Sequence, residues 1–173
     1  MRSFHPAVLA LAAAAFLPVH AQQGPTDPQI AAIVVTANQV DIEAGKLAKS
    51  RSKSQDIRQF AQQMITDHTG VNQQATALVR KLKVEPEPSD TSRNLQKGGV
   101  ENLARLAKLQ GKEFDKAYVD QEVSYHQAVL DAIDKTLLPA ARNGELKGLI
   151  AKVRPAIAAH LDHAKHLQAA LDK

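Results

Sequence analysis

The chain has 173 residues, with 22 lysines and arginines against 18 aspartates and glutamates, and it contains no cysteine. Disulfides and lipid attachment through an N-terminal cysteine are therefore excluded. The positive charge is mild and no basic cluster is interleaved with aromatic side chains, so the sequence does not favour nucleic-acid binding. Alanine, leucine, lysine and glutamine dominate the composition, which favours helices.

Residues 1–21 have the pattern of a secretory signal peptide. Arg2 supplies a positive start, residues 7–19 form a short apolar run, and Val19-His20-Ala21 is a small-residue cleavage signal. Cleavage near Ala21-Gln22 predicts a periplasmic or secreted mature protein of residues 22–173, a length that suits one domain. No segment approaches the ~20 apolar residues of a membrane span, so no transmembrane segment is predicted. Peripheral association with the outer membrane and a protein partner are left open.

Four long amphipathic helices are predicted from the spacing of apolar side chains, which recur every three to four residues. Asp27, as a capping carboxylate, and Pro28 mark the start of the first helix, and Ser54 is the expected cap of the second. Four such helices predict an all-α fold, a four-helix bundle. The predicted helices span residues 28–50, 54–83, 111–137 and 145–171.

The connection between the second and third predicted helices, residues 84–110, is longer than a simple hairpin needs. Pro86 and Pro88 forbid helix at its start, and Gly98-Gly99 is expected to be a second break. Residues 100–110 then predict a short amphipathic helix. We interpret the connection as a crossover along the bundle that carries its own short helix.

Each of the four predicted helices carries one metal-capable side chain at a similar depth. Asp41, His68, His126 and His160 follow the predicted starts of their helices by 13 to 15 residues. At a rise of ~1.5 Å per residue, these depths agree within ~3 Å. Each residue lies on the apolar stripe near the midpoint of its helix, so antiparallel packing still places all four in one layer of the core.

Imidazole and carboxylate ligands together suit iron, zinc, manganese or copper, whereas a purely oxygen site suits calcium or magnesium. The sequence therefore predicts one transition-metal ion in the bundle core. Asp115 and Glu122, on the helix that carries His126, are further candidate ligands. Asp67 and Tyr118 are candidate partners for the second nitrogen of a ligating histidine.

Two other interpretations fit the same residues. One is a buried His/Asp/Tyr cluster that is purely structural, in an envelope stress or interaction module whose function lies on an outer face. The other is a metal-dependent oxidoreductase, which needs more carboxylates at the layer and an open coordination position. His163 and His166 lie off the apolar stripe and are interpreted as a solvated face. No catalytic residue is assigned.

Four blocks of the sequence resemble one bacterial family, that of secreted ferritin-like proteins described as outer-membrane proteins, domain of unknown function 4142. The blocks are DIEAGKLA (41–48), FAQQMITDH (60–68), FDKAYVDQEVSYH (114–126) and RPAIAAHLDHA (154–164). The resemblance extends over residues 29–171 and implies a ferritin-like four-helix bundle in the periplasm, with no established activity.

The chain also departs from what the resemblance leads one to expect. Asp41 stands where the family usually has a glutamate, whose side chain is one methylene longer. The Glu-x-x-His pairs of di-iron ferritin-like proteins are absent, because Glu122 precedes His126 by four residues and Asp67 precedes His68 directly. A shared fold therefore does not carry ferroxidase chemistry or iron storage to this chain.

Overall fold

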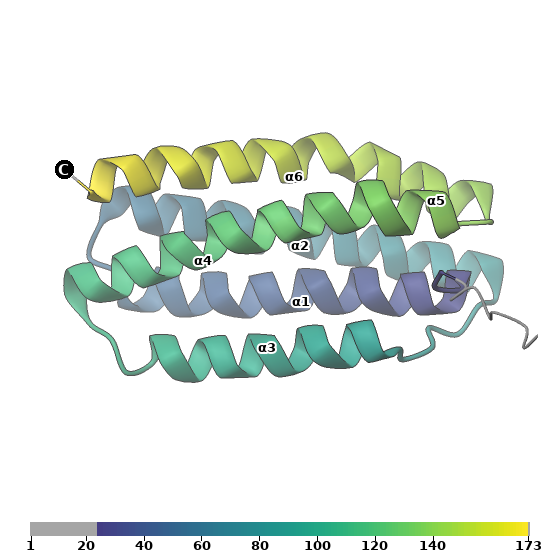
Figure 1. The fold of residues 1–173 in the computed structure, drawn as a ribbon, viewed down its shortest axis with the longest axis horizontal. Coiled ribbons are helices and arrows are strands. Elements are labelled where there is room, and N and C mark those ends of the chain that lie inside the picture. The colour runs from purple at the N-terminus through teal and green to yellow at the C-terminus, as the bar shows by residue number, and fades with distance from the viewer. Residues whose placement is uncertain (1–23, 173) are drawn as a thin grey trace, which may run out of the picture.

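The computed structural model describes residues 24–172, and no strand occurs in that range (Figure 1). The predicted signal peptide lies outside the described residues. The elements are α1 (Asp27–Arg51), α2 (Gln55–Leu82), α3 (Asp90–Leu106), α4 (Gly111–Ala132), the π-helix η1 (Ile133–Leu137), the short α5 (Leu138–Ala140) and α6 (Gly144–Leu171). The prediction of an all-α fold is confirmed. The long predicted helices correspond to α1, α2, α4 with η1, and α6. Between residues 24 and 172, no helix combines the length and the apolar character that a membrane span requires.

The start of α1 is set by a capping box, but not at the predicted residue. The Thr26 hydroxyl accepts a hydrogen bond from the Gln29 backbone, and the Gln29 side chain accepts one from the Thr26 backbone. The predicted cap at Asp27 is wrong: its carboxylate accepts hydrogen bonds from the backbone N–H groups of Arg142 and Asn143, each at 2.9 Å. Asp27 thereby ties the start of α1 to the turn that precedes α6.

The long helices run side by side along the molecule, and α3 carries the chain back from one end to the other (Figure 1). The helices α1 and α2 are antiparallel neighbours. Next, α3 lies along the outside of α1, so that α4 runs in the same direction as α2, and α6 returns alongside α4. The predicted crossover in the long connection is therefore present.

The helix in this connection is longer than predicted, and the expected break at Gly98-Gly99 is wrong. A capping box between Ser89 and Ser92 starts α3 at Asp90, so both glycines lie inside the helix. Gly99 is required by packing, because a Cβ there would lie 2.7 Å from Val40 Cγ2 on α1. The glycine lets two helices approach closely instead of ending one of them.

Two hydrophobic clusters fill the interior on either side of a polar layer. One gathers around Phe60, Met64 and Phe114, and the other around Ile30 and Ile150. Each long helix contributes to both clusters or runs from one to the other. Most of the buried polar side chains lie between them, where apolar neighbours on both sides exclude water and strengthen electrostatic interactions. Six of the nine buried polar or charged side chains in residues 24–172 form this layer, namely Asn38, Asp41, His68, Glu122, His126 and His160.

Candidate metal centre

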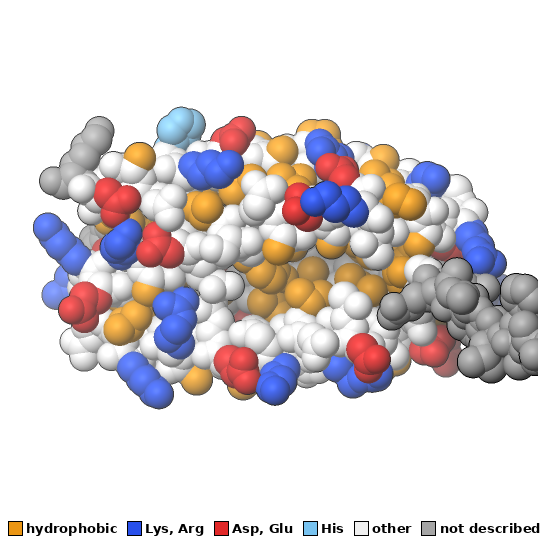
Figure 2. Space-filling view, viewed as in Figure 1, with side chains coloured by type: hydrophobic (Ala, Val, Ile, Leu, Met, Phe, Trp, Pro, Cys, Tyr) orange, Lys and Arg blue, Asp and Glu red, His pale blue; other side chains and the backbone are white. Residues whose placement is uncertain are grey.

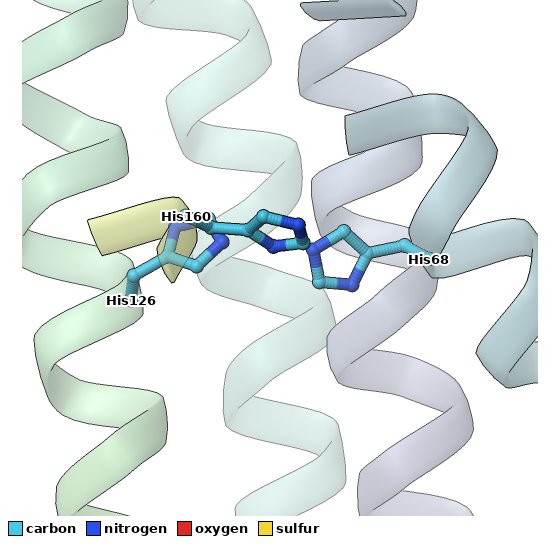
Figure 3. A group of neighbouring side chains, drawn as sticks. All are labelled: His68, His126 and His160. Atoms are coloured by element: carbon cyan, nitrogen blue, oxygen red, sulfur yellow. The ribbon is translucent and has the colours of Figure 1, made fainter. Parts of the chain in front are cut away.

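Three imidazole rings meet in the polar layer. His68 comes from α2, His126 from α4 and His160 from α6, and all three are buried. Their ring centroids lie 5.3 to 5.7 Å apart, and Figure 3 shows the rings pointing toward one another from three different helices. Each histidine occupies the apolar stripe of its helix, so helical periodicity directs it inward.

Asn38, one turn before Asp41 on α1, fixes the tautomer of His68. The Asn38 amide nitrogen donates to the Val34 carbonyl at 2.8 Å, which leaves Oδ1 facing the ring. His68 Nδ1 lies 2.7 Å from that oxygen and therefore carries the proton it donates. His68 Nε2 is left with its lone pair, unless a second proton binds there.

The other two rings are held in the same way. His126 Nδ1 donates to the Glu122 backbone carbonyl at 3.0 Å, and His160 Nε2 donates to Asp67 Oδ2 at 2.9 Å. Both oxygens can only accept, so the remaining lone pairs are on His126 Nε2 and His160 Nδ1. Outer partners of this kind orient ligating histidines in metal sites.

Asp41 faces these lone pairs from α1. Its Oδ2 lies 2.8 Å from His68 Nε2 and 3.3 Å from His126 Nε2, and the side chain is fully buried. With the proton of His68 on Nδ1, these atoms have no hydrogen-bond partner among residues 24–172. Two acceptors at this distance repel each other unless a cation, either a proton or a metal ion, lies with them. The unpaired acceptor atoms of this layer are therefore arranged to bind a cation.

Glu122 and His160 extend the set of unpaired acceptors. Glu122 Oε2 and His160 Nδ1 are buried without a hydrogen-bond partner in the described chain. The candidate ligand atoms of the three histidines lie within 4.8 Å of one another, and so do those of Asp41, Glu122 and His126. Because His126 belongs to both groups, five side chains form one continuous donor set. Leaving such acceptors unpaired costs ~1–3 kcal/mol each, a cost that a bound cation removes.

Burial determines the charge of most of these groups. Burial lowers the pKa of His126 from 6.5 to about 4, although the Asp41 charge opposes it, and burial also lowers the pKa of His160. Burial, together with the Asp41 charge, raises the pKa of Glu122 well above its usual value. Burial alone would raise the pKa of Asp41 too, but the imidazoles, His68 foremost, hold that pKa below its usual value. Near pH 7 the layer therefore presents neutral imidazoles at His126 and His160 and an ionised Asp41, while the pKa shift of Glu122 favours its protonated form.

This donor set fits a divalent transition metal. Imidazole nitrogens with one or two carboxylate oxygens suit iron, zinc, manganese or copper, and the low-dielectric surroundings strengthen the attraction. Ionised Asp41 and Glu122 together would balance the charge of a divalent ion, so the filled site would be neutral. Such neutrality lowers the energetic cost of burying the charges.

Five of the six predicted ligands are brought together, and Asp115 is not. Asp115 precedes Glu122 by seven residues on α4, a separation of ~10 Å along the helix axis. Within residues 24–172 it belongs to neither group of candidate ligand atoms. Asp67, a candidate partner for a ligating histidine, lies beside His160, and its Oδ2 accepts a hydrogen bond from that ring. Tyr118 is buried one turn from Glu122, and its pKa is raised by burial and by that carboxyl group.

Two residues of the site were not among those predicted. Asn38 was missed because an amide on an apolar stripe gave no sign of its partner, although its spacing of three residues from Asp41 places both on one face of α1. Tyr125 is the other, because an aromatic side chain on an apolar stripe usually belongs to the core. Its hydroxyl donates to the Ala37 carbonyl at 2.8 Å, and its ring meets His126 edge-on with centroids 6.1 Å apart.

Comparison with known protein families gives a match over most of the chain. Residues 13–167 match the domain of unknown function DUF4142. Comparisons with curated proteins and with solved structures give no match. The family predicted from the four sequence blocks is therefore confirmed, and the chain belongs to the DUF4142 family.

Proposed function

We propose that this protein binds one transition-metal ion, of iron, zinc, manganese or copper, in the core of its helical bundle. Asp41, His68, His126 and His160 are the proposed ligands, with Glu122 as a further ligand once it loses its proton. One observation carries the proposal: lone pairs of three imidazoles converge with a carboxylate, while the other nitrogen of each ring is held by a fixed acceptor.

The arrangement also supports a ferritin-like four-helix bundle as the fold type. Ferritin-like bundles have one long crossover and place their metal ligands on facing helices. Here α3 lies in such a crossover, and the proposed ligands come from all four long helices. The signal-peptide pattern of residues 1–21 supports export, and N-terminal sequencing of the exported protein should then begin at Gln22.

A purely structural cluster is the main alternative, and the contacts argue against it. A structural network pairs each buried donor with an acceptor. The outer nitrogen of each histidine ring follows that rule, because it donates to a fixed acceptor. At the centre of the layer, however, Asp41 Oδ2 faces the lone pairs of His68 Nε2 and His126 Nε2. A network that served stability alone would gain by replacing one of these acceptors with a donor.

Elemental analysis of the untagged protein, purified without chelators, tests the proposal. The matched variants are His160→Ala and His166→Ala, because both residues lie on α6 but His166 is exposed and belongs to neither ligand group. We expect near-stoichiometric iron, zinc, manganese or copper in the wild type and in His166→Ala. In His160→Ala the metal content should fall to the background level.

Thermal unfolding in the presence of each ion separates weak occupancy from absence of a site. A metal that binds only the folded state raises the melting temperature with its concentration. No metal in the purified protein, together with no thermal shift for any of the four ions, would contradict the proposal. The buried layer would then be a structural cluster, and function would have to be sought on the outer faces.

A further inference from the structure

A pocket of about 450 Å³ connects the candidate metal centre with the surface between α3 and α4. Figure 2 shows a hollow on this face, with hydrophobic side chains at its base. The pocket lies where α3 packs against α1 and makes few contacts with α4. Its lining comes from α1, α3 and α4 and includes Asp41, Asn94, Gly98, Asn102 and Glu122.

Two of the proposed ligands form part of this lining. Asp41 and Glu122 are only 1 % and 2 % exposed, yet both border the pocket. Both oxygens of Asp41 and Oε2 of Glu122 have no hydrogen-bond partner in the described chain. None of the three histidines lines the pocket. The candidate centre therefore meets this pocket through its carboxylate side.

The charge and size of the pocket select what can pass. Its lining is apolar or neutral apart from the two acidic residues and contains no lysine, arginine or histidine. Arg105 donates to Asn102 Oδ1 at 2.7 Å, but it is not part of the lining. An anion would have no charged partner there, whereas a cation would meet the two carboxyl groups. The volume equals that of about fifteen water molecules, enough for a divalent ion with about six waters.

We propose that this pocket is the passage through which a hydrated divalent cation reaches Asp41 and Glu122 and then the three histidines. The inference rests on the proposed function and adds the route and its selectivity for cations. The carboxyl oxygens of Asp41 and Glu122 would replace the first water ligands of the ion, since they are oxygen ligands like water. The imidazole nitrogens behind them would complete its binding.

Gly98 offers a way to obstruct the passage without disturbing the core. It lines the pocket, and a Cβ at this position would meet nothing within 4 Å. Gly98→Leu should fill part of the opening, and the change favours helix by ~1 kcal/mol. Gly148→Leu is the matched control, because Gly148 is also exposed and helical, has no atom within 4 Å of the added Cβ, and lies outside this lining.

Asn94 allows an independent test by charge. It is exposed and lines the pocket, so Asn94→Lys should repel a divalent ion at the opening. Gln96→Lys adds the same charge to the same helix outside this lining and serves as the control. The effect of Asn94→Lys should shrink as salt concentration rises, because the charge is screened.

The experiment is stopped-flow mixing of the metal-free full chain and its variants with Co²⁺, followed by visible absorbance. We expect Gly98→Leu to slow association and dissociation by about tenfold while changing Kd by less than about twofold, because an obstruction alters rates in both directions. Asn94→Lys should slow association at low salt by about tenfold. Both controls should bind at the wild-type rate.

Two results would overturn the passage, and they differ in what they say about the metal site. If Gly98→Leu and Asn94→Lys bind one Co²⁺ per chain at the wild-type rate, the ion reaches the core by another route and the proposed metal site stands. If the wild type binds no Co²⁺, iron, zinc, manganese or copper, the passage and the proposed function both fail.

Discussion

The Nε2 atom of His68 lies 2.8 Å from Oδ2 of Asp41, although the proton on this ring is held at Nδ1 by Asn38. A nitrogen lone pair and a carboxylate oxygen therefore face each other in a buried layer. Only a cation makes this contact favourable, and a second proton on His68 or a bound metal ion can supply it. Substitutions at this pair therefore test whether a metal ion or a proton is the cation.

Asp41→Asn separates the two roles of that contact. The asparagine amide can donate to the His68 lone pair, so the shape is kept and the repulsion between acceptors is removed. We expect the free energy of unfolding without metal to change by less than ~1 kcal/mol, as is common when a neutral pair replaces buried charges. The rise in melting temperature on adding Zn²⁺ should disappear. A loss of several kcal/mol without metal would instead support a structural cluster.

Asn38→Ala should weaken metal binding without removing a ligand. The substitution frees the His68 ring to rotate and to change tautomer, and losing an outer partner typically costs ~10–100-fold in metal affinity. Asn72→Ala is the control, because Asn72 also bonds α1, at the Val35 carbonyl, but lies outside the ligand groups. Titration of both variants with Zn²⁺ against a competing chelator gives the affinities. Equal affinities would contradict the role assigned to Asn38.

The metal-free protein should lose stability in mildly acidic solution because of His126. The pKa of this group is 6.5 in the unfolded state and about 4 in the folded state, where burial lowers it. The unfolded state therefore binds more protons between these values, and the contribution of His126 is full above pH 6.5 and lost as pH falls to about 4. The loss is on the order of 3 kcal/mol.

Urea unfolding with EDTA, repeated across this range of pH, measures the effect. In His126→Gln the free energy of unfolding should depend less on pH than in the wild type. In the exposed His166→Gln it should depend on pH as in the wild type. Some dependence of the free energy of unfolding on pH remains in His126→Gln, because burial also lowers the pKa of His160. Asp41, Glu122 and His68 face the same ring. The same slope in His126→Gln and in the wild type would contradict this assignment.

Metal binding near pH 7 should release a proton from Glu122. Burial and the Asp41 charge raise the pKa of Glu122 well above its usual value, which favours the protonated side chain in the metal-free protein, and a ligating carboxylate must lose that proton. Calorimetric titration with Zn²⁺ in two buffers of different ionisation enthalpy counts the released protons. Glu122→Gln should release about one proton fewer than the wild type. An unchanged count would show that Glu122 does not bind the ion.

Gly99→Ala and Gly98→Ala should have opposite effects on stability. At Gly99 the new methyl group would lie 2.7 Å from Val40 Cγ2, and valine has one strongly preferred rotamer in a helix, so we expect a loss of ~1–3 kcal/mol. At Gly98 nothing lies within 4 Å, so alanine should stabilise α3 by up to ~1 kcal/mol. Chemical denaturation of the two variants checks this. Equal gains at both positions would contradict the close packing of α3 on α1.

The sequence by itself determined the positions of the long helices and the depth of the metal-capable side chains within them. Both follow from short-range rules: apolar residues recur with the period of the helix, and the rise per residue is constant. Asp41, His68, His126 and His160 could therefore be assigned to one layer before any packing was known. Asp67, directly before His68, was only a candidate partner, because the sequence does not show which histidine it contacts.

Only the tertiary structure decided what those side chains face. Gly98-Gly99 resembles a helix break in the sequence, and its role became clear only where Val40 of another helix meets Gly99. Asp27 resembles a cap for its own helix but binds the backbone before α6. Asn38 and the pocket beside Asp41 likewise depend on which helices are neighbours. Helical periodicity fixes the direction of a side chain from its own axis, whereas its partners depend on the packing of segments far apart in the chain.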